Sequence, residues 1–325
     1  MSDNTHFEPH IVALGGGTGL SNLLRGLKRY TSRITAIVAV TDDGGSSGTL
    51  RRELGILPPG DIRNCLVALS EEENLMAQLF QYRFPYAGSL SGHSFGNLFL
   101  TAMSALAGGF DTGIARAGEV LAIRGRVLPV TLRSVTLRAK LANGRIVRGE
   151  SNISRSDKRI TSLHIHPFPP PAAPQVLEAI ANADAIVLGP GSLYTSIISN
   201  LLVEGVAEAM NNNKAPKIYV GNIMTQPGET SNYSLHDHVR AIEKHAGGRF
   251  LDHVIINSAP IPAAVARRYA RKDSYPVAAG LDERLRKLSV IKADVISNYE
   301  YARHDSDKLA SAIFRLINRR RSVVL

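Results

Sequence analysis

Residues 10–51 read HIVALGGGTGLSNLLRGLKRYTSRITAIVAVTDDGGSSGTLR, and this stretch decides the fold class. Its apolar run at 11–14 has no polar interruption, which is typical of a strand buried on both faces of a parallel sheet. A glycine-rich loop follows at 15–19, and leucines then recur at helical spacing over 20–27. A second apolar run at 34–40 leads into a second glycine-rich loop. The stretch therefore predicts a β-α-β unit with a glycine-rich loop after each strand.

Glycine-rich loops between a strand and a helix are suited to phosphate, because the backbone can approach an anion closely and the helix N-terminus directs unpaired N–H groups at it. The first loop departs from the dinucleotide pattern GxGxxG at Leu20, and no Walker lysine follows it. By itself this loop is equally compatible with a tight turn. In the second loop, Asp42 and Asp43 suit a ribose hydroxyl, a hydrated magnesium ion or the capping of the next helix.

The same pattern returns in the second half of the chain. An apolar run at 185–188 leads into GPGSLYTS, and another at 217–220 leads into GNIMTQPGET. In an open parallel sheet, ligands bind beyond the carboxyl ends of the strands, where such loops meet. A single loop of this kind is readily explained as a turn, but several at the same edge of the sheet are not. We therefore expect a phosphate-bearing ligand at that edge.

Two further loops open helices and carry polar side chains. Asp61 follows a Pro-Pro-Gly turn and is expected to cap a helix, with Arg63 and Asn64 in its first turn. There they suit either an anion or surface capping. The second loop, SGHSFGN, places His93 before a long helix, where it is either an active-site residue or a structurally bonded imidazole.

The middle of the chain has a different character, with short alternating runs over 127–167. The Asn-Gly pair at 143–144 predicts a two-residue hairpin between two of them. His164 and His166 would face the same side of a strand, but a metal site usually needs three or more ligands. We therefore expect one α/β domain over 8–325, after a loose tail at 1–7. Its doubly wound, mainly parallel Rossmann-like sheet would carry an antiparallel β excursion at about 125–167.

Composition excludes several classes of protein. The chain has 325 residues and 44% hydrophobic content, which is enough for a substantial core. Its net charge of +10 favours anionic ligands, but tryptophan is absent and no nucleic-acid module is recognisable, so we expect no nucleic-acid partner. The single cysteine, Cys65, fits a reducing compartment. With no apolar run of about 18 residues and a polar first stretch, we expect no membrane span, no secretion signal and a cytoplasmic location.

Six motifs, in this order, resemble those of the bacterial gluconeogenesis factors of the phospholactate transferase-like (CofD-like) superfamily: GGGTGL, TDDGGSSGTLR, PPGDIRN, GHSFGN, GPGSLYTS and NIMTQPGET. The likeness extends over 10–318. It implies a nucleotide-binding fold that takes a nucleotide sugar of the UDP-N-acetylglucosamine type and acts in gluconeogenic growth, cell shape and cell-wall synthesis. In enzymatic relatives, the same cleft holds guanosine diphosphate, a deazaflavin acceptor and magnesium, and a phospholactyl group is transferred.

Loop chemistry and resemblance together assign the ligand contacts. The resemblance implies that Arg51 and Arg63 are cations for the diphosphate and that Asp43 is a magnesium ligand. One minor departure is Ser199, where relatives are expected to have proline before the asparagine. The candidate binding residues are Gly15, Gly16, Gly17, Thr18, Gly19, Asp42, Asp43, Gly44, Ser46, Ser47, Arg51, Arg63, Asn64, His93, Asn97, Gly189, Pro190, Gly191, Ser192, Tyr194, Thr195, Asn222, Thr225 and Gln226.

Two functions remain open on this basis. The first is a regulatory protein that binds a nucleoside-diphosphate sugar without turnover, alone, as a homodimer or with a protein partner in cell-wall regulation. The second is a transferase that acts on a nucleoside-diphosphate adduct, with Mg²⁺ held by Asp42 or Asp43. Binding a diphosphate and stabilising it as a leaving group use the same parts, so the sequence does not separate them. A nicotinamide-dependent enzyme is a third, weaker interpretation, and no Ser-His-Asp or Cys-His nucleophile pattern supports covalent catalysis.

Overall fold

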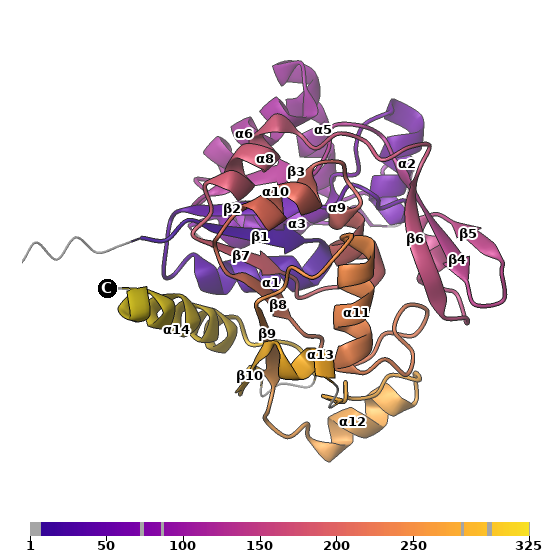
Figure 1. The fold of residues 1–325 in the computed structure, drawn as a ribbon. Coiled ribbons are helices and arrows are strands. Elements are labelled where there is room, and N and C mark those ends of the chain that lie inside the picture. Colours follow the sequence, from indigo (N-terminus) through magenta and orange to yellow (C-terminus); the bar gives the residue numbers. More distant parts are fainter. Residues whose placement is uncertain (1–7, 72–74, 86–87, 281–282, 298–300, 325) are drawn as a thin grey trace, which may run out of the picture.

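A parallel sheet of seven strands organises the structure, a computed structural model that describes residues 8–71, 75–85, 88–280, 283–297 and 301–324 (Figure 1). The predicted α/β class with a doubly wound, mainly parallel sheet is confirmed. The predicted loose tail at 1–7 lies outside the described residues. In spatial order the strands are β10 (Ser289–Ala293), β9 (His253–Asn257), β8 (Lys217–Val220), β7 (Ala185–Leu188), β1 (Ile11–Gly15), β2 (Ile34–Val38) and β3 (Arg126–Pro129).

The direction in which the chain builds this sheet reverses between β1 and β7. From β1 the chain continues outward to β2 and β3, and it later returns to the other side of β1 as β7 before continuing through β8, β9 and β10. Ile11 pairs with Ile34 on one side and with Ala185 on the other, so the three central strands are in step. Loops that leave the carboxyl ends at such a reversal enclose the crevice in which open parallel sheets bind ligands.

Helices cover both faces of the sheet, which explains why its central strands are apolar throughout. In β1, Ile11 and Ala13 face α1 (Gly17–Leu27), α3 (Gly60–Leu69) and α14 (Ser306–Val324). Val12 and Leu14 face the other layer, with α8 (Pro174–Ala181), α10 (Val206–Asn212) and α11 (Leu235–His245) (Figure 1). The other helices are α2 (Gly45–Leu54), α4 (Leu75–Gln81), α5 (Phe95–Ala107), α6 (Phe110–Val120), α7 (Glu150–Ile153), the π-helix η1 (Leu193–Ile198), α9 (Ser199–Leu201), α12 (Ala263–Ala270) and α13 (Glu283–Arg286).

The C-terminal helix α14 packs directly on α1. The two helices approach so closely that a Cβ atom on Gly26 would lie 2.0 Å from the backbone oxygen of Ser306. On the sheet side, α1 contributes four fully buried leucines, each worth about 2 kcal/mol of transfer free energy. Hence α1, whose N-terminus follows the first glycine loop, is held rigidly between the sheet and α14.

A small antiparallel sheet stands beside the main one, on the right in Figure 1, with strand order β5 (Ile146–Arg148), β4 (Thr136–Leu141), β6 (Ile160–His166). The predicted excursion is therefore present, with two corrections. Its first predicted strand, β3, instead pairs in parallel with β2 and extends the main sheet. The hairpin loop has three residues, not two, because Leu141 pairs with Arg145 and Gly144 adopts a φ of +82°. That is a type of loop in which glycine takes the left-handed position.

Among the described residues, no single helix is both long and apolar enough to cross a bilayer. The helices α5 and α6 meet that test of length and composition only as a pair, which is bent by 117°.

Candidate functional site

A cavity of about 600 Å³ opens at the reversal point of the sheet. Its walls come from the loops after β1, β7 and β8, together with segments near residues 269–274 and 302–304. The structure thus brings together predicted residues from three distant loops, which lie on its lining: Gly16, Gly17, Thr18, Gly19, Pro190, Gly191, Ser192, Asn222, Thr225 and Gln226. Gly15 and Gly189 lie one step behind it, at the ends of β1 and β7, where the Gly189 N–H donates to the Leu14 carbonyl at 2.9 Å.

Two of the glycines are required by the geometry of this cavity. Gly17, the first residue of α1, has a φ of +60°, a region that favours glycine. A Cβ atom on Gly19 would lie 2.2 Å from the Pro190 carbonyl oxygen, so the first and third glycine loops meet in direct backbone contact. No acidic side chain lies in the first turn of α1. Apart from the Gly17 N–H, which donates to the Asp61 carboxylate, the N–H groups of this turn and its positive dipole end are available to an anion in the cavity.

The loop after β8 is tied to the loop after β7 by a side-chain hydrogen bond. Gln226 Nε2 donates to Ser192 Oγ at 3.1 Å. The other amide atom, Gln226 Oε1, is buried and has no partner among the described residues. A buried amide oxygen without a partner costs free energy, so its place beside a cavity is suited to a ligand donor.

His304 lines the same cavity and was missed by the sequence analysis, because no glycine loop or spacing marks it. Its backbone oxygen accepts a hydrogen bond from Asn22 Nδ2 at 2.6 Å, which joins this segment to α1. Burial lowers the pKa of His304 to about 4, against a hydrogen bond to the Gly221 backbone that raises it. The imidazole is therefore neutral at pH 7. The other lining residues that were missed are Asn22, Arg25, Ser196, Ile223, Met224, Pro227, Tyr269, Lys272, Ser274, Ala302 and Arg303.

A second group of predicted residues forms a buried polar network next to this cavity. Ser46 Oγ lies 3.0 Å from His93 Nδ1 and accepts from Asn97 Nδ2 at 3.1 Å. Arg63 donates to Asn97 Oδ1 at 3.0 Å and to Asn64 Oδ1 at 2.9 Å. Burial lowers the pKa of Arg63 to about 10, so the guanidinium stays charged at pH 7. Ser46 of α2, Asn97 of α5 and Arg63 of α3 are thus linked by one series of hydrogen bonds.

Asp61 connects the network to the cavity, and its expected role as a helix cap is wrong. The N-cap of α3 is Pro59, and the Asp61 carboxylate accepts a hydrogen bond from the Gly17 backbone instead. A Cβ atom on Gly16 would lie 2.8 Å from Asp61 Oδ2. Burial, and then the nearby Asp42, raise the pKa of Asp61 to about 6. A carboxyl group whose pKa lies close to neutral pH is therefore found directly behind the first glycine loop.

Two further buried acids were not predicted. Glu229 accepts from the Tyr194 N–H at 2.9 Å and from Thr195 Oγ1 at 2.8 Å, and burial raises its pKa. The Tyr194 hydroxyl lies 2.8 Å from the Tyr233 hydroxyl, and neither Tyr194 nor Thr195 lines the cavity. Glu150 accepts from Thr41 Oγ1 at 2.6 Å, and burial raises its pKa well above the ordinary value.

The loop after β2 makes mostly internal contacts. Asp42 Oδ1 accepts from the Gly44 N–H at 2.9 Å, and Ser47 Oγ accepts from the Gly60 N–H at 3.1 Å. Arg51, predicted to bind the diphosphate, donates instead to the connection before β4, including Ser134 Oγ at 3.2 Å. Its contacts lie with the small sheet, and the cavity is lined without it.

Asp43 Oδ1 accepts from the Ser151 N–H at 2.9 Å. Among the described residues, no three His, Cys, Asp or Glu side chains are grouped as metal ligands. Because Mg²⁺ commonly takes one or two protein carboxylates and completes its shell with water and phosphate oxygens, magnesium at Asp43 stays a prediction. His164 bonds Ser162 Oγ at 3.1 Å on the exposed face of β6.

Comparisons with known proteins agree on one family. The family model described as 2-phospho-L-lactate transferase CofD matches residues 11–296. The gluconeogenesis factor of Bacillus subtilis (strain 168) is 46% identical over 312 residues, which is 95% of this chain and 98% of that protein. The gluconeogenesis factor of Halalkalibacterium halodurans is 47% identical over 310 residues, covering 94% and 95% respectively. The crystal structure of protein BH3568 from Bacillus halodurans superposes with a TM-score of 0.91 at 46% identity, covering 95% of this chain and 100% of that one.

Proposed function

Because this chain belongs to the CofD family and is closely related to gluconeogenesis factors, we propose that it is a cytoplasmic regulatory protein that binds a nucleoside-diphosphate sugar of the UDP-N-acetylglucosamine type. Its role would be to link gluconeogenic growth to cell shape and cell-wall synthesis. The observation that carries the proposal is the convergence of three strand-end loops and the N-terminus of α1 on one cavity. Its volume, about 600 Å³, lies in the usual range of small-molecule sites.

The lining residues suggest where each part of such a ligand would lie in the cavity. The diphosphate would lie against the N-terminus of α1 and the loop after β7 and would use the backbone N–H groups there that do not already donate to Asp61 or Glu229. Arg25, Lys272 and Arg303 also line the cavity and supply positive charge for it. The uracil and sugar would then lie toward Asn222 and Gln226, whose amides offer both donors and acceptors.

Calorimetry with UDP-N-acetylglucosamine tests the proposal. We expect binding by the natural protein and at least about tenfold weaker binding by Gly19→Ala, because the new methyl group displaces the Pro190 loop. The matched control is Gly248→Ala, since nothing lies within 4 Å of the methyl group there. Binding that is unchanged in Gly19→Ala, or absent from the natural protein, contradicts the proposal.

A transferase that acts on a nucleoside-diphosphate adduct is the second candidate. It is favoured by the buried pair of Ser46 and His93 and by the raised pKa of Asp61 beside the first glycine loop. We expect the sugar nucleotide to be recovered intact after long incubation with magnesium. Release of UDP by transfer of the sugar to water, or of UMP by transfer of the sugar phosphate to water, together with a larger loss of turnover than of binding in Asp43→Asn, would instead support the transferase.

A further inference from the structure

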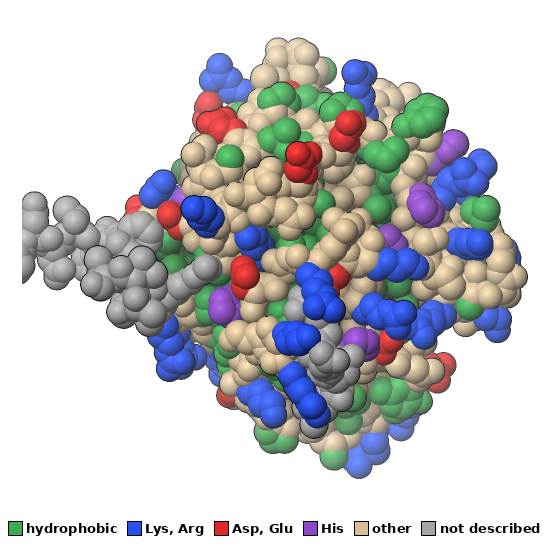
Figure 2. Space-filling view, in the orientation of Figure 1, with side chains coloured by type: hydrophobic (Ala, Val, Ile, Leu, Met, Phe, Trp, Pro, Cys, Tyr) green, Lys and Arg blue, Asp and Glu red, His purple; other side chains and the backbone are tan. Residues whose placement is uncertain are grey.

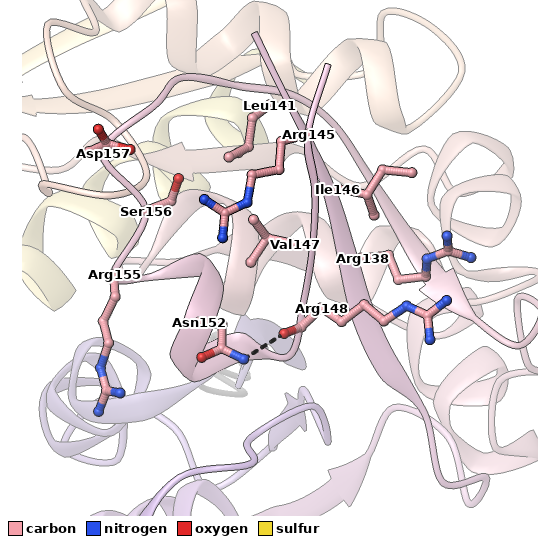
Figure 3. Close-up of a pocket in the computed structure, with 10 residues that line it drawn as sticks. All are labelled: Arg138, Leu141, Arg145, Ile146, Val147, Arg148, Asn152, Arg155, Ser156 and Asp157. Atoms are coloured by element: carbon pink, nitrogen blue, oxygen red, sulfur yellow. Dashed lines mark hydrogen bonds between the residues drawn. The ribbon is translucent and has the colours of Figure 1, made fainter. Parts of the chain in front are cut away.

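A second cavity, of about 750 Å³, surrounds the outer edge of β5 in the small sheet. Four arginines line it, and we call it the arginine groove: Arg138, Arg145, Arg148 and Arg155. Arg138 and Arg148 lie on one side of the strand, and Arg145 and Arg155 lie on the other (Figure 3). Figure 2 shows basic side chains gathered over this sheet. The groove is separate from the cavity at the sheet reversal and uses none of its lining residues.

The arrangement of two of these arginines is unfavourable without an anion. Arg138 and Arg148 are direct partners across β4 and β5. The flanking pairs exchange backbone hydrogen bonds, with Gly149 N–H donating to Leu137 at 2.9 Å. The arginine pair is therefore of the non-hydrogen-bonded type, in which side chains are closest and like charges destabilise the sheet. Within the part of the chain that the structure describes, neither guanidinium has a hydrogen-bond or ion-pair partner.

The net charge of the groove stays positive when its acidic lining residue is included. Asp157 is the acidic residue on the lining, and its carboxylate pairs with Lys158 at 3.1 Å. Arg145 lies near enough to lower the pKa of Asp157, but only after the Lys158 contacts. One shared carboxylate cannot balance four guanidinium groups, so the groove is suited to a ligand with several negative charges.

The backbone of β5 adds a second, independent feature. It is an edge strand, and the alternation of the ladder directs the N–H and C=O of Ile146 away from β4. The Arg148 carbonyl is already satisfied by Asn152 Nδ2 at 2.9 Å (Figure 3). Ile146 is 53% exposed, which leaves an apolar contact on the same edge. Free backbone groups in an edge strand are a template for an added strand.

We propose that the arginine groove binds an extended acidic segment of a partner protein, which pairs with β5 as an added strand and places carboxylates against the four arginines. Backbone pairing favours a peptide over a nucleic acid, and no aromatic side chain lines the groove for base stacking. The bound segment would lie next to α7, whose Ser151 N–H donates to Asp43 Oδ1 at 2.9 Å. The partner would therefore contact an element that is hydrogen-bonded to the glycine-rich loop after β2.

Fluorescence anisotropy with the full chain tests this proposal, using as the probe a labelled peptide that repeats glutamate-glutamate-valine, which as a strand presents carboxylates on both sides. We expect salt-sensitive binding that weakens at least about tenfold in the double variant Arg138→Gln, Arg148→Gln. The matched control removes two exposed arginines elsewhere, Arg116→Gln and Arg124→Gln, and should bind as the natural protein does. Thermal melting checks that each variant is folded.

Two further measurements distinguish backbone pairing of the peptide with β5 from simple attraction between charges. Ile146→Pro removes the outward N–H without changing the charge, and we expect it to weaken binding. If that variant does not fold, a probe with proline in place of valine makes the same test from the ligand side and should not bind. The proposal is overturned if the proline probe or a thymidine oligonucleotide binds as tightly as the peptide, if both double variants lose binding equally, or if the peptide does not bind.

Discussion

Single buried acids set the electrostatics behind the glycine loops. Asp61 and Glu229 both have a pKa raised by burial, and both accept backbone N–H groups from the loops that line the main cavity. Each carboxylate thus holds a loop in place. Asp61 lies directly against Gly16, where a Cβ atom would be 2.8 Å from its Oδ2, so this single acid contributes to both the shape and the charge of the site.

Asp61→Asn should change how stability depends on pH. The folded pKa of about 6 exceeds the ordinary value of 3.8, so the folded state binds the proton more tightly than the unfolded state does. The stability that this proton confers is fully present below about pH 4 and is lost as pH rises through 6, on the order of 3 kcal/mol in total. Urea unfolding between pH 4 and 7 should show a smaller decline in the variant. Equal slopes for the two proteins would contradict this assignment.

At the scale of elements, α1 is the part on which the site depends. Its N-terminus faces the cavity, and its body is held between the sheet and α14 by buried leucines and the close contact at Gly26. The motion of this helix would move Gly17 and Asn22 together, because both belong to it. The packing of α14, which begins two residues after the cavity-lining segment 302–304, therefore contributes to the site geometry.

Gly26→Ala should destabilise the protein although alanine is the better helix former by about 1 kcal/mol. The new methyl group would lie 2.0 Å from the Ser306 oxygen, which forces α14 away from α1. Overpacking of this kind costs about 1–3 kcal/mol net, measured as a lower urea midpoint. Gly248→Ala, which meets open space, should remain within about 0.5 kcal/mol of the natural protein. A stabilised Gly26→Ala would show that the helices separate freely.

At the scale of the whole molecule, the reversal of the sheet unites loops that are about 200 residues apart along the chain, such as those at Gly16 and Gln226. The small sheet then extends the surface on the far side of α7, with its own basic groove. The main cavity and the arginine groove are thus two separate sites lined by basic side chains. An anionic ligand at each would be consistent with a regulatory protein that binds one ligand and contacts a partner.

A thermal-shift screen tests the ligand class on the whole protein. A ligand that binds only the folded state at about 100 times its dissociation constant adds about 2.7 kcal/mol of stability. We expect UDP-N-acetylglucosamine to raise the melting temperature by about 5 °C or more, and GDP, NAD and free uridine to raise it less. A larger shift with NAD than with any UDP-sugar would favour a nicotinamide enzyme instead.

Local pattern was sufficient for much of the structure. Mainly apolar runs predicted four of the seven parallel strands, β1, β2, β7 and β8, because burial on both faces leaves few polar positions. Local sequence pattern was insufficient where a distant pairing partner decides the role of a strand or a side chain. The strand β3 carries the same short alternating pattern as β4, and only pairing with β2 assigns it to the main sheet. Likewise, Asp61 has the sequence context of a cap, yet the approach of Gly17 gives it another role.

What the sequence determined by itself is the α/β class, the glycine loops and their position after buried strands, since these follow from hydrophobic periodicity and backbone freedom along adjacent residues. Only the tertiary structure decided which of those loops line one cavity, that Arg51 turns toward the small sheet, and that His304 and the arginine groove exist as sites at all. The physical reason is that a binding site is set by which distant segments meet and by the water they exclude, and neither is encoded in the spacing of neighbouring residues.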